Sequence, residues 1–160
     1  DWSSDVCSSD LINRETDYGV LILSQMAADP ERRYSAAALA ADRGLPPPVV
    51  SKILKHLVRQ GLLVSYRGAK GGYGLARPPE QITIADIVSA MEGPISLTHC
   101  TDADPSSCQY HEGCVASSNW NRINRLVEQA LEAISLKDMI SPLPSGRARE
   151  AYVPLTALSR

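Results

Sequence analysis

The strongest hydrophobic pattern in the chain lies between Pro46 and Gln60. Apolar residues recur there at three- and four-residue spacings, as on one face of an amphipathic helix. These positions are Val49, Val50, Ile53, Leu54, Leu57 and Val58. Proline suits a first helical turn, whose amides have no helical partner, and Gly61 is typical of a helix end. The pattern predicts a helix from Pro47 to Gln60.

A β-hairpin is predicted directly after this helix. Residues 62–66 and 73–76 are rich in strand formers, and Gly68, Gly71 and Gly72 lie between them. Glycine permits the positive φ angles and close backbone approaches that a tight hairpin tip requires.

The residues before the amphipathic helix predict two more helices. Apolar spacing predicts one over residues 12–28, capped by Thr16 or Asp17. Ser35 precedes an alanine-rich helix predicted at 36–41, and a glycine turn follows it. Helix, turn, helix and hairpin in this order are typical of a winged helix-turn-helix.

The second half of the chain predicts a short helix at 84–91 and a long one at 120–134. Thr83 and Asp86 have capping-box spacing before the short helix. The long helix carries a continuous apolar stripe of Trp120, Ile123, Leu126, Val127, Ala130, Leu131 and Ile134. Such a stripe must be covered, so we interpret it as a dimerisation helix; packing within the same subunit is the alternative. Residues 135–140 add one more helical turn.

The charge distribution favours DNA as a partner. From Arg43 to Arg77 there are seven Lys or Arg and no Asp or Glu, whereas the whole chain has 16 basic and 18 acidic residues. A positive element on an otherwise acidic body is the electrostatic footprint of a polyanion-binding site. The alternative is a solvated helix and a surface hairpin.

The predicted DNA-contacting residues lie on the helix and on the hairpin, which would be the wing. On the helix they are Ser51, Lys52, Lys55, His56 and Arg59. On the wing they are Arg67, Lys70, Gly71 and Gly72. Ser51 and Lys52 suit base edges, Lys55 and Arg59 suit phosphates, and Arg67 suits the minor groove.

Three cysteines predict a metal or cluster site. Cys100, Cys108 and Cys114 are separated by seven and five residues in a polar segment rich in turn formers. Thiolates suit zinc and iron–sulfur clusters, and the spacing differs from the paired C-x-x-C of zinc ribbons. Free thiols are the alternative. Cys7 is given no role.

The wing, the cysteines and the long helix together resemble the Rrf2 family of winged-helix regulators. The resemblance spans residues 12–140 and is greatest to regulators of iron–sulfur cluster assembly operons of the SUF type. The matching segments are 15–18 (ETDY), 67–73 (RGAKGGY), 82–93 and the cysteine triplet.

The resemblance implies a homodimer that binds operator DNA and holds an iron–sulfur cluster, [2Fe–2S] in preference to [4Fe–4S], through the three cysteines and a fourth ligand. Some members have a histidine three residues after the last cysteine, where this chain has Ser117. Asp17 matches a carboxylate supplied by the partner subunit in related nitric-oxide sensors. We rank Asp17 first, His111 second and Glu15 third as the fourth ligand.

These observations predict a mainly α fold: a winged helix-turn-helix with a small β-hairpin wing and a long C-terminal dimerisation helix. Its predicted parts are a non-native or disordered extension (1–11), the DNA-binding domain (12–93), the cysteine-rich loop (94–118), the dimerisation helix (119–140) and a flexible tail (141–160). No apolar run of about 20 residues is available to span a membrane, and no signal peptide is evident, so we expect a cytoplasmic protein.

The function expected from the resemblance is repression of iron–sulfur assembly genes according to cluster status. Alternatives are a thiol-redox or zinc-binding regulator on the same fold, a redox or sulfur-transfer enzyme, and a winged-helix interaction module without DNA binding. We expect no enzyme, because no Cys–His pair with an orienting residue and no phosphate-binding glycine loop is present.

Overall fold

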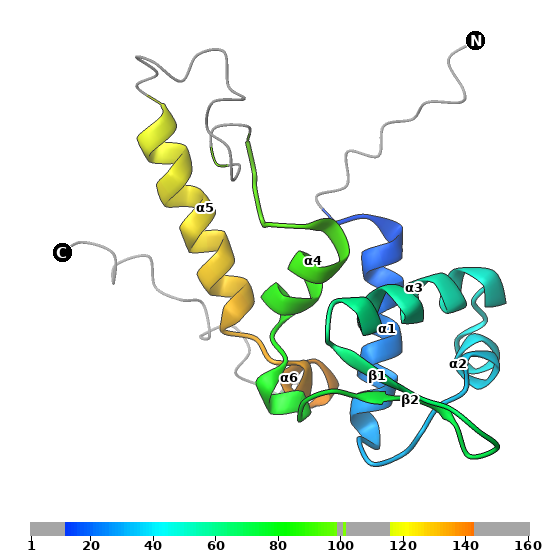
Figure 1. Ribbon diagram of the computed structural model, residues 1–160. Coiled ribbons are helices and arrows are strands. Elements are labelled where there is room, and N and C mark those ends of the chain that lie inside the picture. The colour runs from blue at the N-terminus through cyan, green and yellow to red at the C-terminus, as the bar shows by residue number, and fades with distance from the viewer. Residues whose placement is uncertain (1–11, 99–100, 102–115, 143–160) are drawn as a thin grey trace, which may run out of the picture.

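The computed structural model describes residues 12–98, 101 and 116–142 (Figure 1). The elements, in chain order, are α1 (Arg14–Ala28), α2 (Ala36–Arg43), α3 (Pro47–Arg59), β1 (Leu63–Tyr66), β2 (Gly72–Leu75), the 3₁₀ turn η1 (Pro79–Gln81), α4 (Ile84–Glu92), α5 (Ser117–Glu132) and α6 (Leu136–Ile140). The predicted mainly α, winged helix-turn-helix fold is confirmed. No helix within these described residues is long and apolar enough to cross a membrane.

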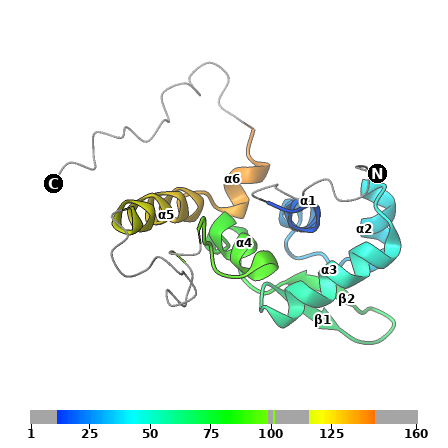
Figure 2. The ribbon, with the colours of Figure 1, turned by 90° about the horizontal axis from the view of Figure 1, so that it is seen from above.

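The hydrophobic core is built around α1. Figure 2 looks down this helix and shows α2, α3, α4 and α6 surrounding it. The largest fully buried side chains are aliphatic: Ile22, Leu23, Met26, Leu39, Val50, Ile53, Leu54, Leu57, Leu63, Ile82, Ile87 and Leu136. The apolar spacing of α3 therefore faces the core as predicted, which leaves its charged face outside.

The start of α1 differs from the prediction. Asn13, not Thr16 or Asp17, caps the helix: its side-chain oxygen accepts the Thr16 backbone N–H at 2.9 Å. Thr16 is fully buried inside the first turn. The prediction was wrong because it began the helix at Ile12 and passed over an Asn, one of the most favourable N-cap residues.

The helix-turn-helix connections follow the predicted local signals. Ser35 caps α2, its hydroxyl accepting the Ala38 N–H at 3.1 Å. The helix runs two residues beyond the predicted end, to Arg43, and stops at Gly44, whose φ of 63° is the left-handed conformation that glycine adopts most easily. Proline occupies the first turn of α3, as predicted.

The wing is an antiparallel hairpin in which Leu63 pairs with Leu75 and Tyr66 with Gly72. A third segment joins it at one edge. The N–H of Tyr34 donates to the carbonyl of Tyr73 at 3.0 Å, and the N–H of Tyr73 donates back at 2.8 Å. The connection between α1 and α2 is thereby fixed to the wing.

The C-terminal helices return the chain to the winged domain. Thr83 and Asp86 form the predicted capping box of α4, and Ser135 and Asp138 form a second one at α6. The backbone N–H of Leu136 donates to the carbonyl of Ile82 at 2.7 Å. Helix α6 packs against α1, whereas α5 extends beside α4 and away from the core (Figure 1).

Candidate nucleic-acid interface

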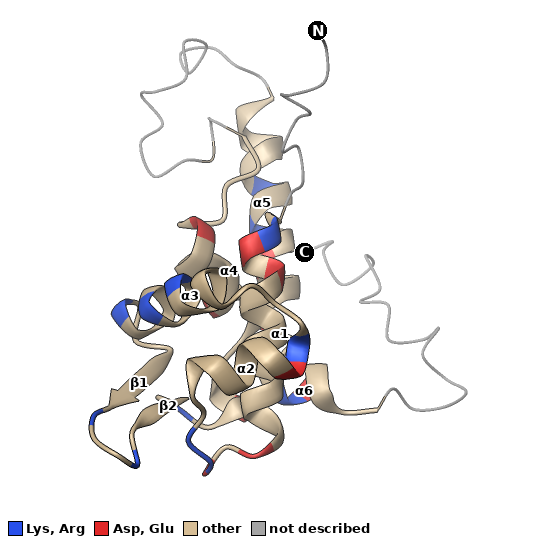
Figure 3. Ribbon diagram, turned by 90° about the vertical axis from the view of Figure 1, so that its right-hand side faces the viewer, with Lys and Arg blue, Asp and Glu red and all other residues tan. Residues whose placement is uncertain are grey.

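Helix α3 presents a row of cations on the face opposite the core. Lys52, Lys55 and Arg59 are exposed and follow one another at three- and four-residue spacing, while Ser51 is partly buried near the start of the helix. Figure 3 shows the basic positions of α3 on the same side of the molecule as those of the wing. A protruding helix with such a face has the dimensions and charge that suit the major groove.

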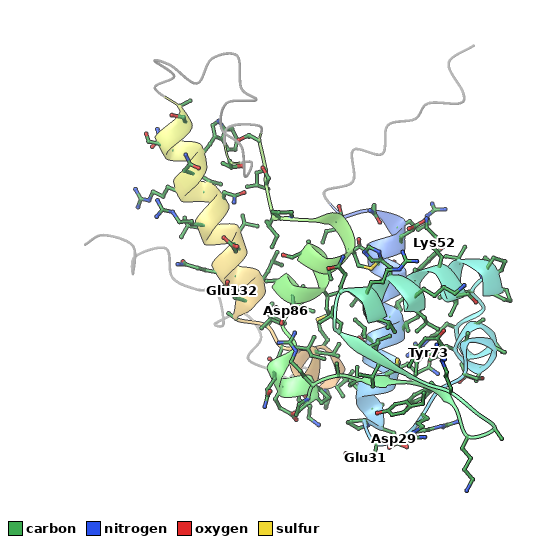
Figure 4. The ribbon with its side chains drawn as sticks, viewed as in Figure 1. Asp29, Glu31, Lys52, Tyr73, Asp86 and Glu132 are labelled. Carbon is green, nitrogen blue, oxygen red and sulfur yellow. The ribbon has the colours of Figure 1, made fainter. Side chains whose placement is uncertain are left out.

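Lys52 is held by an acidic residue of α1. Its Nζ lies 2.6 Å from Oε1 of Glu15, and the two side chains are 68% and 45% exposed. Figure 4 shows Lys52 near the N-terminal end of α1, opposite the end that carries Asp29 and Glu31. An exposed pair of this kind contributes about 0–1 kcal/mol to stability, so a phosphate can replace the carboxylate at little cost.

His56 has a partner within the chain. Its Nε2 lies 2.7 Å from the carbonyl oxygen of Ala90, near the end of α4, and the residue is partly buried. The imidazole therefore ties α3 to α4, and a DNA contact by His56 stays a prediction.

A hollow of about 260 Å³ lies beside α3. It is lined by Glu15, Lys52, Ile53, Lys55, His56, Arg59 and Met91. The cations outnumber the single carboxylate, so this hollow is an extension of the positive face of α3 toward α1 and α4.

The wing tip depends on its glycines. A Cβ at Gly71 would lie 2.5 Å from the carbonyl oxygen of Tyr66, and a Cβ at Gly72 would lie 2.8 Å from that of Tyr34. Gly72 also has a φ of 141°, which disfavours other residues. Arg67 and Lys70 are exposed beside these glycines, as a role in DNA contact requires.

Three of the seven cations in the acid-free stretch have partners outside it, and one of them is Lys52, the exposed partner of Glu15. Arg77 pairs with Asp86 at 3.2 Å, and Nε of Arg43 donates to Oε1 of Gln25 at 2.9 Å. The positive charge that remains available is concentrated on α3 and the wing tip.

The structure brings two further cations to the wing that sequence reasoning missed. Arg32 and Arg33 lie in the α1–α2 connection, and their guanidinium carbons lie 5.0 Å and 3.9 Å from the ring centroids of Tyr34 and Tyr66. Burial and the nearby Asp29 raise the pKa of the Tyr34 phenol above its usual value, so this ring stays neutral. Because Glu31 and Asp29 adjoin these arginines in sequence, their charge was not visible as a basic run.

Comparison with known proteins identifies the family. Residues 12–142 match the Rrf2 family model, described as an iron-dependent transcriptional regulator. The chain belongs to the Rrf2 family. It is therefore a transcriptional regulator and not an enzyme, and the resemblance noted from the sequence is confirmed.

Individual Rrf2 relatives agree with this assignment. The chain is 31% identical to the HTH-type transcriptional regulator CymR of Bacillus subtilis, over 78% of this chain and 85% of that protein. It is 26% identical to NsrR of Shouchella clausii, over 78% and 85% of the two chains. The solved structure of T. potens IscR superposes with a TM-score of 0.63 at 30% identity, covering 81% of this chain and 85% of that one.

The predicted cluster ligands of this Rrf2 chain lie mostly outside the described residues. Cys100, Cys108, Cys114 and His111 all fall there. Asp17 is exposed on the first turn of α1, and Glu15 is the partner of Lys52. Within the part of the chain that the structure describes, no three His, Cys, Asp or Glu side chains are grouped as metal ligands.

Proposed function

We propose that this chain is a cytoplasmic, homodimeric repressor of iron–sulfur assembly genes whose operator affinity depends on a bound iron–sulfur cluster. The observation that carries the DNA-binding part is the shared positive side of α3 and the wing (Figure 3). The cluster part rests on the three closely spaced cysteines and on the family resemblance.

In this proposal α3 enters the major groove. Ser51 and Lys52 approach base edges, while Lys55 and Arg59 meet phosphates. Lys52 leaves Glu15 to do so. Arg67 reaches the adjacent minor groove, and Lys70 with Gly71 and Gly72 lies along the backbone.

A second copy of the chain covers α5. Two large apolar side chains of α5, Trp120 and Ile123, are 40% and 42% exposed, and Ile134, just after the helix, is 42% exposed. A face of this kind on a solvent-exposed helix is typical of a protein interface. In a symmetric dimer the same patch serves both chains, and two α3 helices then read half-sites about 34 Å apart.

The donor set fits an iron–sulfur cluster, [2Fe–2S] in preference to [4Fe–4S]. Cys100, Cys108 and Cys114 supply the thiolates, the ligands that such clusters prefer. Asp17 is the first choice for the fourth ligand, since its exposed position on α1 can be reached by a second copy, ahead of His111 and Glu15. When bound, the cluster supplies a redox-sensitive and labile group; a weak oxygen ligand increases that lability.

The test is anaerobic purification followed by measurement of visible absorption, iron, sulfide and zinc. We expect a coloured protein that contains iron and sulfide. Operator affinity is then compared between the wild type and the triple Cys→Ser variant, on a duplex selected from a random-sequence pool. Colourless protein with stoichiometric zinc would assign the zinc alternative, and equal affinities of loaded wild type and variant would reject the switch.

A further inference from the structure

Of the two arginines in the α1–α2 connection, Arg33 is the one that contacts the hairpin itself. It lies 37 residues before Lys70, yet its Nη1 donates to the Lys70 backbone carbonyl at 3.2 Å. Its guanidinium carbon lies 3.9 Å from the centroid of the Tyr66 ring. The side chain is thus held at two points, one at the end of β1 and one in the turn between β1 and β2.

The backbone beside Arg33 is fixed as well. Tyr34 exchanges both backbone hydrogen bonds with Tyr73, at 3.0 and 2.8 Å. Tyr66 in turn covers the wing, because a Cβ on Gly74 would lie 3.3 Å from its Cε2. The Tyr66 ring therefore lies close to the backbone of β2 at Gly74, and Arg33 lies over the same ring.

This arrangement leaves most of the guanidinium available. An arginine has five N–H donors, and one of them is used by Lys70. Among the described residues the ion pairs are Lys52–Glu15 and Arg77–Asp86, so Arg33 has no carboxylate partner in that part of the chain. Arg33 is exposed, and the basic positions of the α1–α2 connection lie beside those of the wing tip (Figure 3).

We propose that Arg33 is a DNA-phosphate contact of the wing, positioned by stacking on Tyr66 and by the Lys70 carbonyl. This inference rests on the proposed DNA-binding function and adds a residue to it. The guanidinium fork suits phosphate oxygens, and stacking against an aromatic ring reduces the rotamer freedom lost on binding. In this proposal Arg33 contacts the DNA phosphate backbone beside the minor groove that Arg67 enters.

The experiment measures affinity for a labelled mixed-sequence duplex of about three helical turns between about 50 and 200 mM salt. The wild type is compared with the variants Arg33→Gln, Arg33→Lys, Lys55→Ala and Lys137→Ala. Lys137 is exposed on α6, away from the proposed interface, and serves as the control.

Arg33→Gln is expected to weaken binding about fivefold to tenfold and to reduce the salt slope by about one. Arg33→Lys keeps the charge, so its salt slope stays near that of the wild type, and Lys137→Ala changes neither quantity. A weaker Arg33→Gln complex with an unchanged salt slope would overturn the phosphate contact, because it would mean that Arg33 only braces the wing.

The outcomes also separate this inference from the proposed function. If Lys55→Ala weakens binding while Arg33→Gln behaves as the wild type does, DNA binding stands and the role of Arg33 is rejected. If the wild type does not bind the duplex at low salt, both are rejected. Melting temperatures of all variants verify that each one is folded.

Discussion

Helices α3 and α5 are both amphipathic, but they bury opposite kinds of residue. Helix α3 buries Val50, Ile53, Leu54 and Leu57 and exposes its cations. Helix α5, all of which the structure describes, buries a single residue, the polar Asn124, and exposes Trp120 and Ile123. The apolar face of α3 is completed by its own chain, so its charged face is available for DNA. The apolar face of α5 is covered only in part by its own chain, since Leu131 packs against the core while Trp120 and Ile123 stay exposed.

A polar contact of α5 helps to hold the helix in position, in addition to the packing of Leu131 against the core. The side-chain amide of Asn124 donates to the carbonyl of Ile95 and accepts the N–H of Leu97, both at 2.9 Å. An extended segment that leaves α4 thus finds its hydrogen bonds on α5. Because Trp120 and Ile123 are left exposed, binding of a partner to this face is expected to stabilise the helix further.

The largest effect on stability is expected from a substitution in the core beneath α3. Leu54→Ala removes a fully buried side chain and should lower the free energy of unfolding by about 2–5 kcal/mol. Urea denaturation at two protein concentrations measures it, and the loss should be the same at both. Lys55→Ala, at the neighbouring exposed position, should change stability by less than about 0.5 kcal/mol. Comparable losses in the two variants would contradict the division between the faces of α3.

Ile123→Asp tests the exposed apolar face of α5. A charge on the exposed apolar side of α5 occurs twice in a symmetric dimer, so it should weaken association by about 2 kcal/mol or more. Sedimentation of the wild type and the variant measures this, and the variant should be monomeric at concentrations where the wild type is dimeric. Gln129→Glu adds the same charge at an exposed position of α5 outside the apolar stripe and should leave the dimer intact. A dimeric Ile123→Asp protein would place the interface elsewhere.

The sequence predicted those elements whose signals are local. The apolar spacing of α3, the Thr83–Asp86 capping box and the glycine-tipped wing all depend on residues a few positions apart, and all are confirmed. Hydrogen-bonding and steric preferences at this range are properties of the chain itself. The Asn13 cap was missed although its signal was equally local, because the hydrophobic residue before it was taken as helical.

The contacts that position the site could not be predicted in the same way. Asn124 binds a backbone N–H 27 residues away, and Arg33 binds a carbonyl 37 residues away. His56 was predicted to contact DNA, and no signal in the sequence indicated that it also bonds to Ala90 of α4. Such pairings depend on how the helices cross, which hydrophobic periodicity does not specify.

A smaller effect on stability is expected when the two hydrogen bonds of the Asn124 side chain are removed. Asn124 is 8% exposed, and Asn124→Ala leaves the Leu97 N–H and the Ile95 carbonyl without their partner. The loss in unfolding free energy should be about 1–3 kcal/mol. Hydrogen exchange at the Leu97 amide should accelerate, whereas Asn121→Ala on the exposed side of α5 should leave it unchanged. An unaltered exchange rate in Asn124→Ala would show that the amide is protected by other contacts.

The smallest effect concerns the ion pair beside α3. Glu15→Gln releases Lys52 and removes a carboxylate from the hollow that lies beside the cations of α3. Because both partners are exposed, unfolding free energy should change by less than about 1 kcal/mol. Affinity for duplex DNA should rise about threefold, since Lys52 no longer has to exchange a carboxylate for a phosphate. The measurement uses the triple Cys→Ser background, so that a role of Glu15 in cluster binding does not contribute.

The matched control for this substitution is Glu132→Gln on α5, which removes one negative charge far from α3 (Figure 4). If both variants bind DNA more tightly by the same factor, the gain reflects net charge alone and Glu15 has no special relation to Lys52. If Glu15→Gln alone gains affinity, a further Lys52→Ala substitution should abolish that gain. The double variant therefore decides whether the carboxylate acts through Lys52, as the 2.6 Å contact predicts.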